Sequence, residues 1–178
     1  MKPRHRLTYP TRQITIFGKP IPWEKQAKYL GVILDQNLSF SEHIKKVRSR
    51  AAFALSRLHS ILNARSKLSL RCKLRIFTTC IRPIMTYACP VFAQAKPHLI
   101  HRMQALQNRS LRKITGSPWF VRNEILHLDL KIPTIRQFMK RNAKRFFDTA
   151  VKHRNPLAVK PRTISPLALA ISDAHGIL

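Results

Sequence analysis

The sequence predicts a mainly α-helical fold, in which a short N-terminal β-hairpin is followed by a helical bundle and by further helices. From residue 39 onward, apolar residues recur at steps of three and four, the spacing of one buried helix face. A β-rich stretch lies before this region and is interrupted by glycine and proline. Hydrophobic residues make up 44% of the 178 positions, which is enough for a packed core.

The first 38 residues, 1–38, are expected to form a small β-element. A β-rich YLGVIL segment at 29–34 follows one glycine and two prolines, a pattern that predicts a hairpin. Ser39 and Glu42 then have the spacing of a capping box, in which two side chains satisfy the first free N–H groups of a helix. A helix is therefore predicted to begin at Ser39.

Residues 39–116 are predicted to form a bundle. Pro83 interrupts the apolar pattern of the second helix and should kink it, because proline lacks a backbone donor. Gly116 is a good C-terminal stop for the third helix. The three helices are expected at about 39–62, 68–88 and 97–116. The centre of the core is expected to contain Leu58, Leu74, Phe77, Ile81 and Leu106.

Further helices are predicted over residues 117–154. A short helix is expected at about 122–128, and Thr134 with Gln137 repeats the capping-box spacing at the start of a last helix. From 155 to 178 the chain contains three prolines, which prevent regular structure. That segment, 155–178, is expected to be a poorly ordered tail.

Charge restricts the class of partner. Lys and Arg number 34 against 7 Asp and Glu, a formal net charge of +27 spread along the whole chain. Such a surplus stores self-repulsion that the phosphates of a nucleic acid would relieve; an anionic membrane surface is the second candidate. Trp119, Phe120 and Trp23 could serve as stacking platforms, but Trp119 is expected in the core, where large aromatic side chains are found more often.

The sequence offers no candidate catalytic residue and no candidate metal site. No two acidic residues are closer than five positions, whereas two-metal phosphoryl transfer needs converging carboxylates. His98 and His101 lack a third ligand nearby, and the thiols of Cys72, Cys80 and Cys89 are interpreted as small core residues. Neither a secretory signal nor a disulfide framework is present, so an intracellular location, nuclear or cytoplasmic, is expected.

Three segments resemble the reverse transcriptases of non-LTR retrotransposons of the jockey-like (LINE-type) group. They are KYLGVILDQNLSFSEHI at 28–44, FTTCIRPIMTYACPVF at 77–92 and LQNRSLRKITGSPWFVRNEILHLDLKIPTI at 106–135. They occur in the family's order and cover about two-thirds of the chain. Where the family usually has His-Arg-Asp-Leu, this chain has His-Leu-Asp-Leu, starting at His127.

The resemblance implies a place within the polymerase for each part of the chain. Residues 1–38 would be the end of the palm, with a primer-grip strand around Tyr29 and Gly31, and residues 39–116 would be the thumb. The family's catalytic Phe/Tyr-Ala-Asp-Asp motif lies upstream of the YLGV segment and does not occur in this sequence. The resemblance therefore implies a fragment that is inactive alone and holds no cofactor, although the parent enzyme would use Mg²⁺.

The partners implied are nucleic acid, as RNA template and DNA primer, and the palm and fingers of the polymerase; no membrane partner is expected. Basic side chains of the helices would contact phosphates without reading bases. The residues predicted to contact nucleic acid are Lys28, Tyr29, Gly31, Lys45, Lys46, Arg48, Arg109, Arg112, Lys113 and Arg122.

Two other hypotheses remain open from the sequence alone. The chain could be a self-standing basic RNA- or DNA-binding structural protein, or an interaction protein whose helices dock on a membrane or an acidic partner. Flanking DNA that encodes the Asp-Asp palm would favour the polymerase fragment over the first of these. Competition between lipid vesicles and nucleic acid would test the second.

Overall fold

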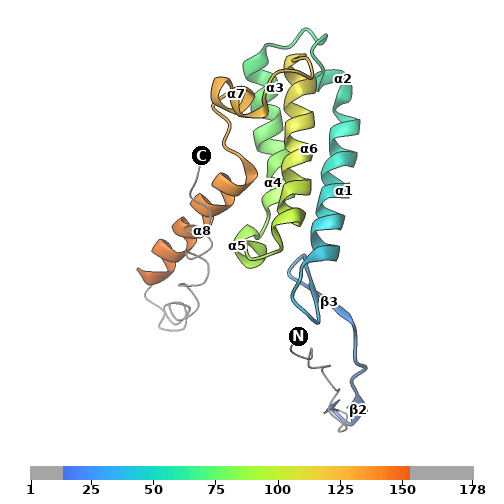
Figure 1. Ribbon diagram of the computed structural model, residues 1–178. Coiled ribbons are helices and arrows are strands. Elements are labelled where there is room, and N and C mark those ends of the chain that lie inside the picture. The colour runs from blue at the N-terminus through green and yellow to red at the C-terminus, as the bar shows by residue number, and fades with distance from the viewer. Residues whose placement is uncertain (1–13, 153–178) are drawn as a thin grey trace, which may run out of the picture.

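The computed structural model describes residues 14–152 and is mainly helical, with short antiparallel strands at the N-terminal end, as predicted. Figure 1 shows three helical segments side by side, two small hairpins below them and a last helix, α8, beside the bundle. The helices of the bundle alternate in direction, so that the first and third, α1 and α6, run the same way. The predicted tail, 155–178, lies outside the described residues.

Both hairpins are closed by two-residue turns that need left-handed backbone. The first joins β1 (Thr15–Ile16) to β2 (Lys19–Pro20), and the second joins β3 (Gln26–Tyr29) to β4 (Val32–Asp35). The central residues of the turns, at 17–18 and 30–31, all have positive φ. This is the type I′ geometry, which matches the right-handed twist of the flanking strands.

The predicted primer-grip strand is the end of the second hairpin. Tyr29 pairs with Val32, and Leu30 and Gly31 form the turn between them. Gly31 has φ +82°, and a Cβ atom there would lie 3.3 Å from the ring of Tyr87. The Tyr87 hydroxyl donates to the Leu30 carbonyl at 3.2 Å. An aromatic ring, rather than a second backbone, therefore approaches Gly31 and fixes the hairpin on the bundle.

The predicted capping box at Ser39 and Glu42 is wrong. Helix α1 (Ser41–Arg57) begins two residues later, and its N-cap residue is Phe40, which is buried and has φ 57°. Asp35 instead holds the backbone just before the helix, accepting from the N–H groups of Ser39 at 3.0 Å and Phe40 at 2.8 Å. Burial alone would raise the pKa of Asp35, but these hydrogen bonds stabilise the carboxylate and lower it overall.

The second helix of the bundle is broken where Pro83 was predicted to kink it. A π-helical turn, η1 (Phe77–Ile81), lies between α3 (Leu70–Ile76) and α4 (Arg82–Thr86). The Arg82 N–H bonds to the carbonyl of Phe77 across the wider turn. Pro83 follows directly and has no N–H to donate. The π turn therefore accommodates the break in the backbone hydrogen-bond pattern of the helix. Two short helices, α2 (His59–Leu62) and α5 (Cys89–Phe92), connect the segments.

The core lies between these segments. Phe77 and Ile81 are completely buried, as predicted, whereas the predicted core residues Leu58, Leu74 and Leu106 are partly buried and pack against it. The third helix, α6 (Pro97–Thr115), ends at Gly116 in the left-handed conformation, as predicted. The fully buried large side chains are Phe40, Ile44, Phe77, Ile81, Met85, Phe92, Met103, Gln107, Leu111 and Ile135, together with Cys89.

Polar contacts attach the last two helices, α7 (Asn123–Asp129) and α8 (Ile135–Val151), to α6. The Gln107 side chain donates to the Pro133 carbonyl at 2.9 Å, and the Ile135 N–H donates to Gln104 at 2.7 Å. His127 is buried, with Nδ1 2.9 Å from the Ile132 carbonyl. Its Nε2 lies 2.9 Å from the side-chain oxygen of a neighbouring asparagine. The segment before α8 is therefore fixed in place.

The second capping box is formed as predicted. The Gln137 N–H donates to Thr134 Oγ1 at 3.2 Å, and the Thr134 N–H donates to Gln137 Oε1 at 3.0 Å. Both donors would otherwise lack partners at the start of α8. The two residues thus set where this helix begins.

Truncation of Phe77 tests the core. Phe77→Ala should lower the free energy of unfolding by about 3–5 kcal/mol, because it removes a completely buried ring and leaves a cavity. Phe53→Ala is the matched control: Phe53 is 66% exposed on α1, so its loss should change stability by about 0.5 kcal/mol or less. Urea unfolding followed by circular dichroism measures both. Equal effects would contradict this assignment of the core.

Buried His43 should make stability depend on pH. Its Nδ1 accepts from the Ile33 N–H at 3.3 Å, and its ring packs edge-on against Phe92. Burial lowers the pKa of His43, so the folded state holds it neutral and the unfolded state binds more protons. The free energy of unfolding should therefore fall as pH drops through about 6.5, the unfolded pKa.

The measurement is urea unfolding at pH 7.5 and at pH 5.5. His43→Asn, which keeps an acceptor for Ile33, should remove most of the pH dependence, whereas His98→Asn, at an exposed position, should leave it unchanged. If the His43→Asn variant lost as much unfolding free energy between pH 7.5 and pH 5.5 as the unsubstituted protein, the pH dependence would not come from His43.

Candidate nucleic-acid interface

Positive charge on the described surface is almost unneutralised. Within residues 14–152, the ion pair found is Lys45 Nζ with Glu42 Oε2 at 3.8 Å. The acids Glu124, Asp129 and Asp148 form no ion pair among these residues. An ordinary solvated helix carries acids beside its bases, so these helices present an unbalanced cationic field.

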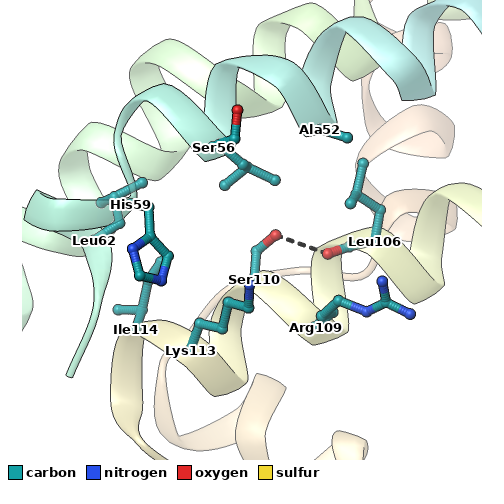
Figure 2. A pocket seen from close by; sticks show the side chains of 10 residues that line it. Ala52, Ser56, His59, Leu62, Leu106, Arg109, Ser110, Lys113 and Ile114 are labelled. Atoms are coloured by element: carbon teal, nitrogen blue, oxygen red, sulfur yellow. Dashed lines mark hydrogen bonds between the residues drawn. The ribbon is translucent and has the colours of Figure 1, made fainter.

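A groove lies between α1 and α6 and is rimmed by cations. It encloses about 240 Å³. Figure 2 shows Arg109 and Lys113 of α6 on one side and Ser56 and His59 of the α1–α2 segment on the other. Ser110 donates to the Leu106 carbonyl at 2.8 Å and so offers its oxygen, but not its hydrogen, to a ligand. The lining residues of this α1–α6 groove are Ala52, Leu55, Ser56, His59, Leu62, Leu106, Arg109, Ser110, Lys113 and Ile114.

Helical spacing extends both rims toward the hairpins. On α1, Lys45 lies seven residues before Ala52, and Arg48 four before it, so both share the face of the groove lining. On α6, Arg102 precedes Arg109 by seven residues and continues that rim. From residue 45 to residue 59 the α1 rim is about 20 Å long at 1.5 Å per residue.

The structure brings together only some of the predicted contact residues. Lys45, Arg48, Arg109 and Lys113 belong to the rims of the α1–α6 groove, whereas Lys46 lies on another face of α1. Two groove residues that the sequence analysis missed are Ser56 and His59; their helical spacing from Lys45 and Ala52 was the available signal. Elsewhere, the second hairpin carries Lys28, Tyr29 and Gly31.

Arg112 holds a loop rather than facing a ligand. Its guanidinium donates to the Pro118 carbonyl at 2.6 Å, to Asn123 Oδ1 at 3.0 Å and to the Val121 carbonyl. Three of its five donors are thus used within the protein. Arg122, the N-cap residue of α7, is exposed at the end of the same loop.

The expectation that Trp119 lies in the core is wrong. Trp119 is 88% exposed and Phe120 69% exposed, and their rings meet edge to face with centroids 6.1 Å apart. The loop between α6 and α7 is tied down by its backbone and by Arg112, so neither ring reaches the core. The core prediction for the thiols is right for buried Cys89 and wrong for exposed Cys72 and Cys80.

A second cationic cluster joins α4 to α8. Arg82 is only 8% exposed, and its guanidinium lies over the Phe138 ring at 4.8 Å, while Arg141 lies over the same ring at 5.6 Å. Burial, and next the charge of Arg141, lower the pKa of Arg82. The electron-rich face of the Phe138 ring thus attracts both guanidinium groups, where a carboxylate would usually be found.

The described residues contain no group of three His, Cys, Asp or Glu side chains placed to hold a metal ion. Among the same residues, no helix has the length and apolar character needed to cross a membrane. The described surface has many cations, few acids and a groove with an apolar floor. Such a surface is chemically suited to a polyanion.

Fold and surface therefore define a helical bundle with a cationic groove, and sequence comparison places it in a family. The chain is 42% identical, over 78% of its length, to the probable RNA-directed DNA polymerase of transposon X-element of Drosophila melanogaster. It is 34% identical, over 88% of its length, to the probable RNA-directed DNA polymerase of transposon BS of Drosophila melanogaster. It is 34% identical, over 82%, to the RNA-directed DNA polymerase from mobile element jockey of Drosophila funebris.

This chain is thus homologous to a segment of the jockey-like, non-LTR retrotransposon reverse transcriptases, which confirms the resemblance found in the sequence. It spans a small part of the curated relatives that it matches: 15% of the X-element polymerase, 17% of that of BS and 16% of that of jockey. No protein-family model matches the chain. No solved structure matches it either.

Proposed function

We propose that this chain is the template–primer-binding segment of a non-LTR retrotransposon reverse transcriptase, with its three-helix bundle acting as the thumb. The observation that carries the proposal is the α1–α6 groove, whose rims supply cations from two parallel helices and whose lining includes no acid. The homology supports the choice of a polymerase substrate, RNA template paired with DNA primer, over other polyanions.

Contact would be made through phosphates. The rims offer Lys and Arg, which bind phosphates, and no recognisable base-reading motif accompanies them. A rim about 20 Å long spans about six nucleotides at 3.4 Å per nucleotide. Binding should therefore tolerate any sequence and weaken steeply with salt.

Catalysis would come from elsewhere in the polymerase. Two acids of the described region serve other ends: Asp35 holds the backbone before α1, and Glu42 pairs with Lys45. The palm and fingers, which the resemblance places upstream, would supply the carboxylates for Mg²⁺ and would be the protein partner of this segment. The second hairpin, fixed by Tyr87, would lie at the boundary with the palm.

Charge removal on the rim tests the proposed contact. If about six phosphates are contacted, the logarithm of the association constant should fall against the logarithm of salt concentration with a slope near −5. The double substitution Arg109→Gln with Lys113→Gln should weaken binding to an RNA–DNA duplex. It should also make the slope shallower by about two, because two phosphates are no longer neutralised. Fluorescence anisotropy of a labelled duplex measures both quantities.

A matched control has the same spacing and the same loss of charge. Arg71→Gln with Arg75→Gln removes two exposed cations four residues apart on α3, outside the groove. Its effect on the slope should be much smaller. Equal effects from both pairs would mean that diffuse net charge, and not the groove, binds the duplex. Arg112 is unsuitable for this test, because its loss would release the loop that it holds.

The chain alone should not extend a primer. Within residues 14–152 no three His, Cys, Asp or Glu side chains are grouped, so these residues offer no assembled carboxylate site for two metal ions. A primer-extension assay with Mg²⁺ and a primed RNA template measures this directly. Template-dependent incorporation by the purified chain would overturn the assignment of catalysis to another part of the polymerase.

A further inference from the structure

We propose that Trp119 is a stacking platform for an unpaired base of single-stranded nucleic acid that leaves the α1–α6 groove. The proposal rests on the proposed function. It adds a binding site for single-stranded nucleic acid on the loop between α6 and α7. Trp119 is 88% exposed although it belongs to the largest apolar side-chain type. An indole exposed to water gains by covering its apolar surface, and a nucleobase is a flat partner that does so.

The loop that carries Trp119 is built to display it. Besides the three Arg112 bonds, the Val121 N–H donates to the Pro118 carbonyl at 3.3 Å, which closes a turn around the two aromatic residues. At the other end, the hydroxyls of Thr115 and Ser117 lie 2.6 Å apart. A fixed ring binds a base at a smaller entropic cost than a mobile one would.

The rings also have a suitable arrangement. Phe120 meets Trp119 at an interplanar angle of 81°, so the two rings are in T-shaped contact and are not stacked on each other. With 88% of its surface exposed, Trp119 keeps most of its indole open to a ligand. A base could therefore stack on Trp119 without displacing Phe120.

The position of the loop connects it to the groove. It follows α6 directly (Figure 1). Arg109 and Lys113, in the last two turns of α6, line the groove with His59. A Cβ atom on Gly116 would lie 3.0 Å from Ala64, so the loop starts beside the connection that follows α2. A strand whose phosphates follow the cationic rim would thus pass from the groove to this loop, where Arg122 adds an exposed cation.

Another occupant would be an apolar surface of the rest of the polymerase, since Ile125 and Leu128 of α7 are also exposed. The charge near the loop favours nucleic acid. Arg122, Lys113 and Arg109 complement phosphates, whereas a protein patch would have to bury or neutralise them. The experiment distinguishes the two.

The chain has two tryptophans, so Trp23→Phe leaves Trp119 as the single reporter. In that background, an oligouridylate of about twelve nucleotides, roughly twice the length of the rim, should quench the Trp119 fluorescence. An abasic oligomer of equal length and charge should bind without quenching. Trp119→Ala should weaken oligouridylate binding about tenfold, the order of one base stack, and leave the salt slope unchanged. Trp119→Phe should restore part of the affinity.

Arg112→Gln, which frees the loop, should weaken oligouridylate binding more than Arg71→Gln, which removes the same charge on α3. Absence of quenching, equal quenching by the abasic oligomer, or unchanged affinity in Trp119→Ala would each overturn the proposal and favour a protein surface as the occupant. None of these outcomes would affect the duplex-binding test of Arg109 and Lys113, so failure of the platform and failure of the proposed function can be told apart.

Discussion

The arrangement of this protein depends on how one buried helical segment packs against the two other helices of the bundle. Phe77, Ile81 and Met85 are completely buried along η1 and α4, and the π turn before Pro83 lets that segment bend while it stays packed. Because this segment packs against α1, and α3 packs against α6, the outer helices are held parallel and close. The α1–α6 groove depends on this packing and on the direct contact between α1 and α6.

Electrostatics acts against this packing. A chain with net charge +27 and a single ion pair within residues 14–152 keeps its cations apart by placing most of them on exposed helix faces. Where a guanidinium is buried, as at Arg82, an aromatic ring replaces the missing carboxylate. A bound polyanion would relieve this repulsion, so under the proposed function the imbalance that costs stability would contribute to affinity.

Polar residues that look functional in the sequence include several that position the site. Asp35 starts α1, and Arg112 holds the loop that displays Trp119. His127 stands where the family usually has the histidine of His-Arg-Asp-Leu, and it is buried against the turn before α8. Arg112, which the sequence suggested as a nucleic-acid contact, thus acts through the backbone of the loop that it holds.

The sequence by itself determined the fold class and the surplus of charge. It also determined where α6 ends and where α8 begins, because periodicity, Gly116 and the Thr134–Gln137 capping box are local signals. Tertiary structure alone decided that Phe40, with Asp35, would begin α1 and that Trp119 would face solvent, since each outcome depends on partners distant in the chain or on a loop conformation. It also decided which cations meet. Lys45 and Lys113 are 68 positions apart and share one groove because the helices between them reverse direction twice.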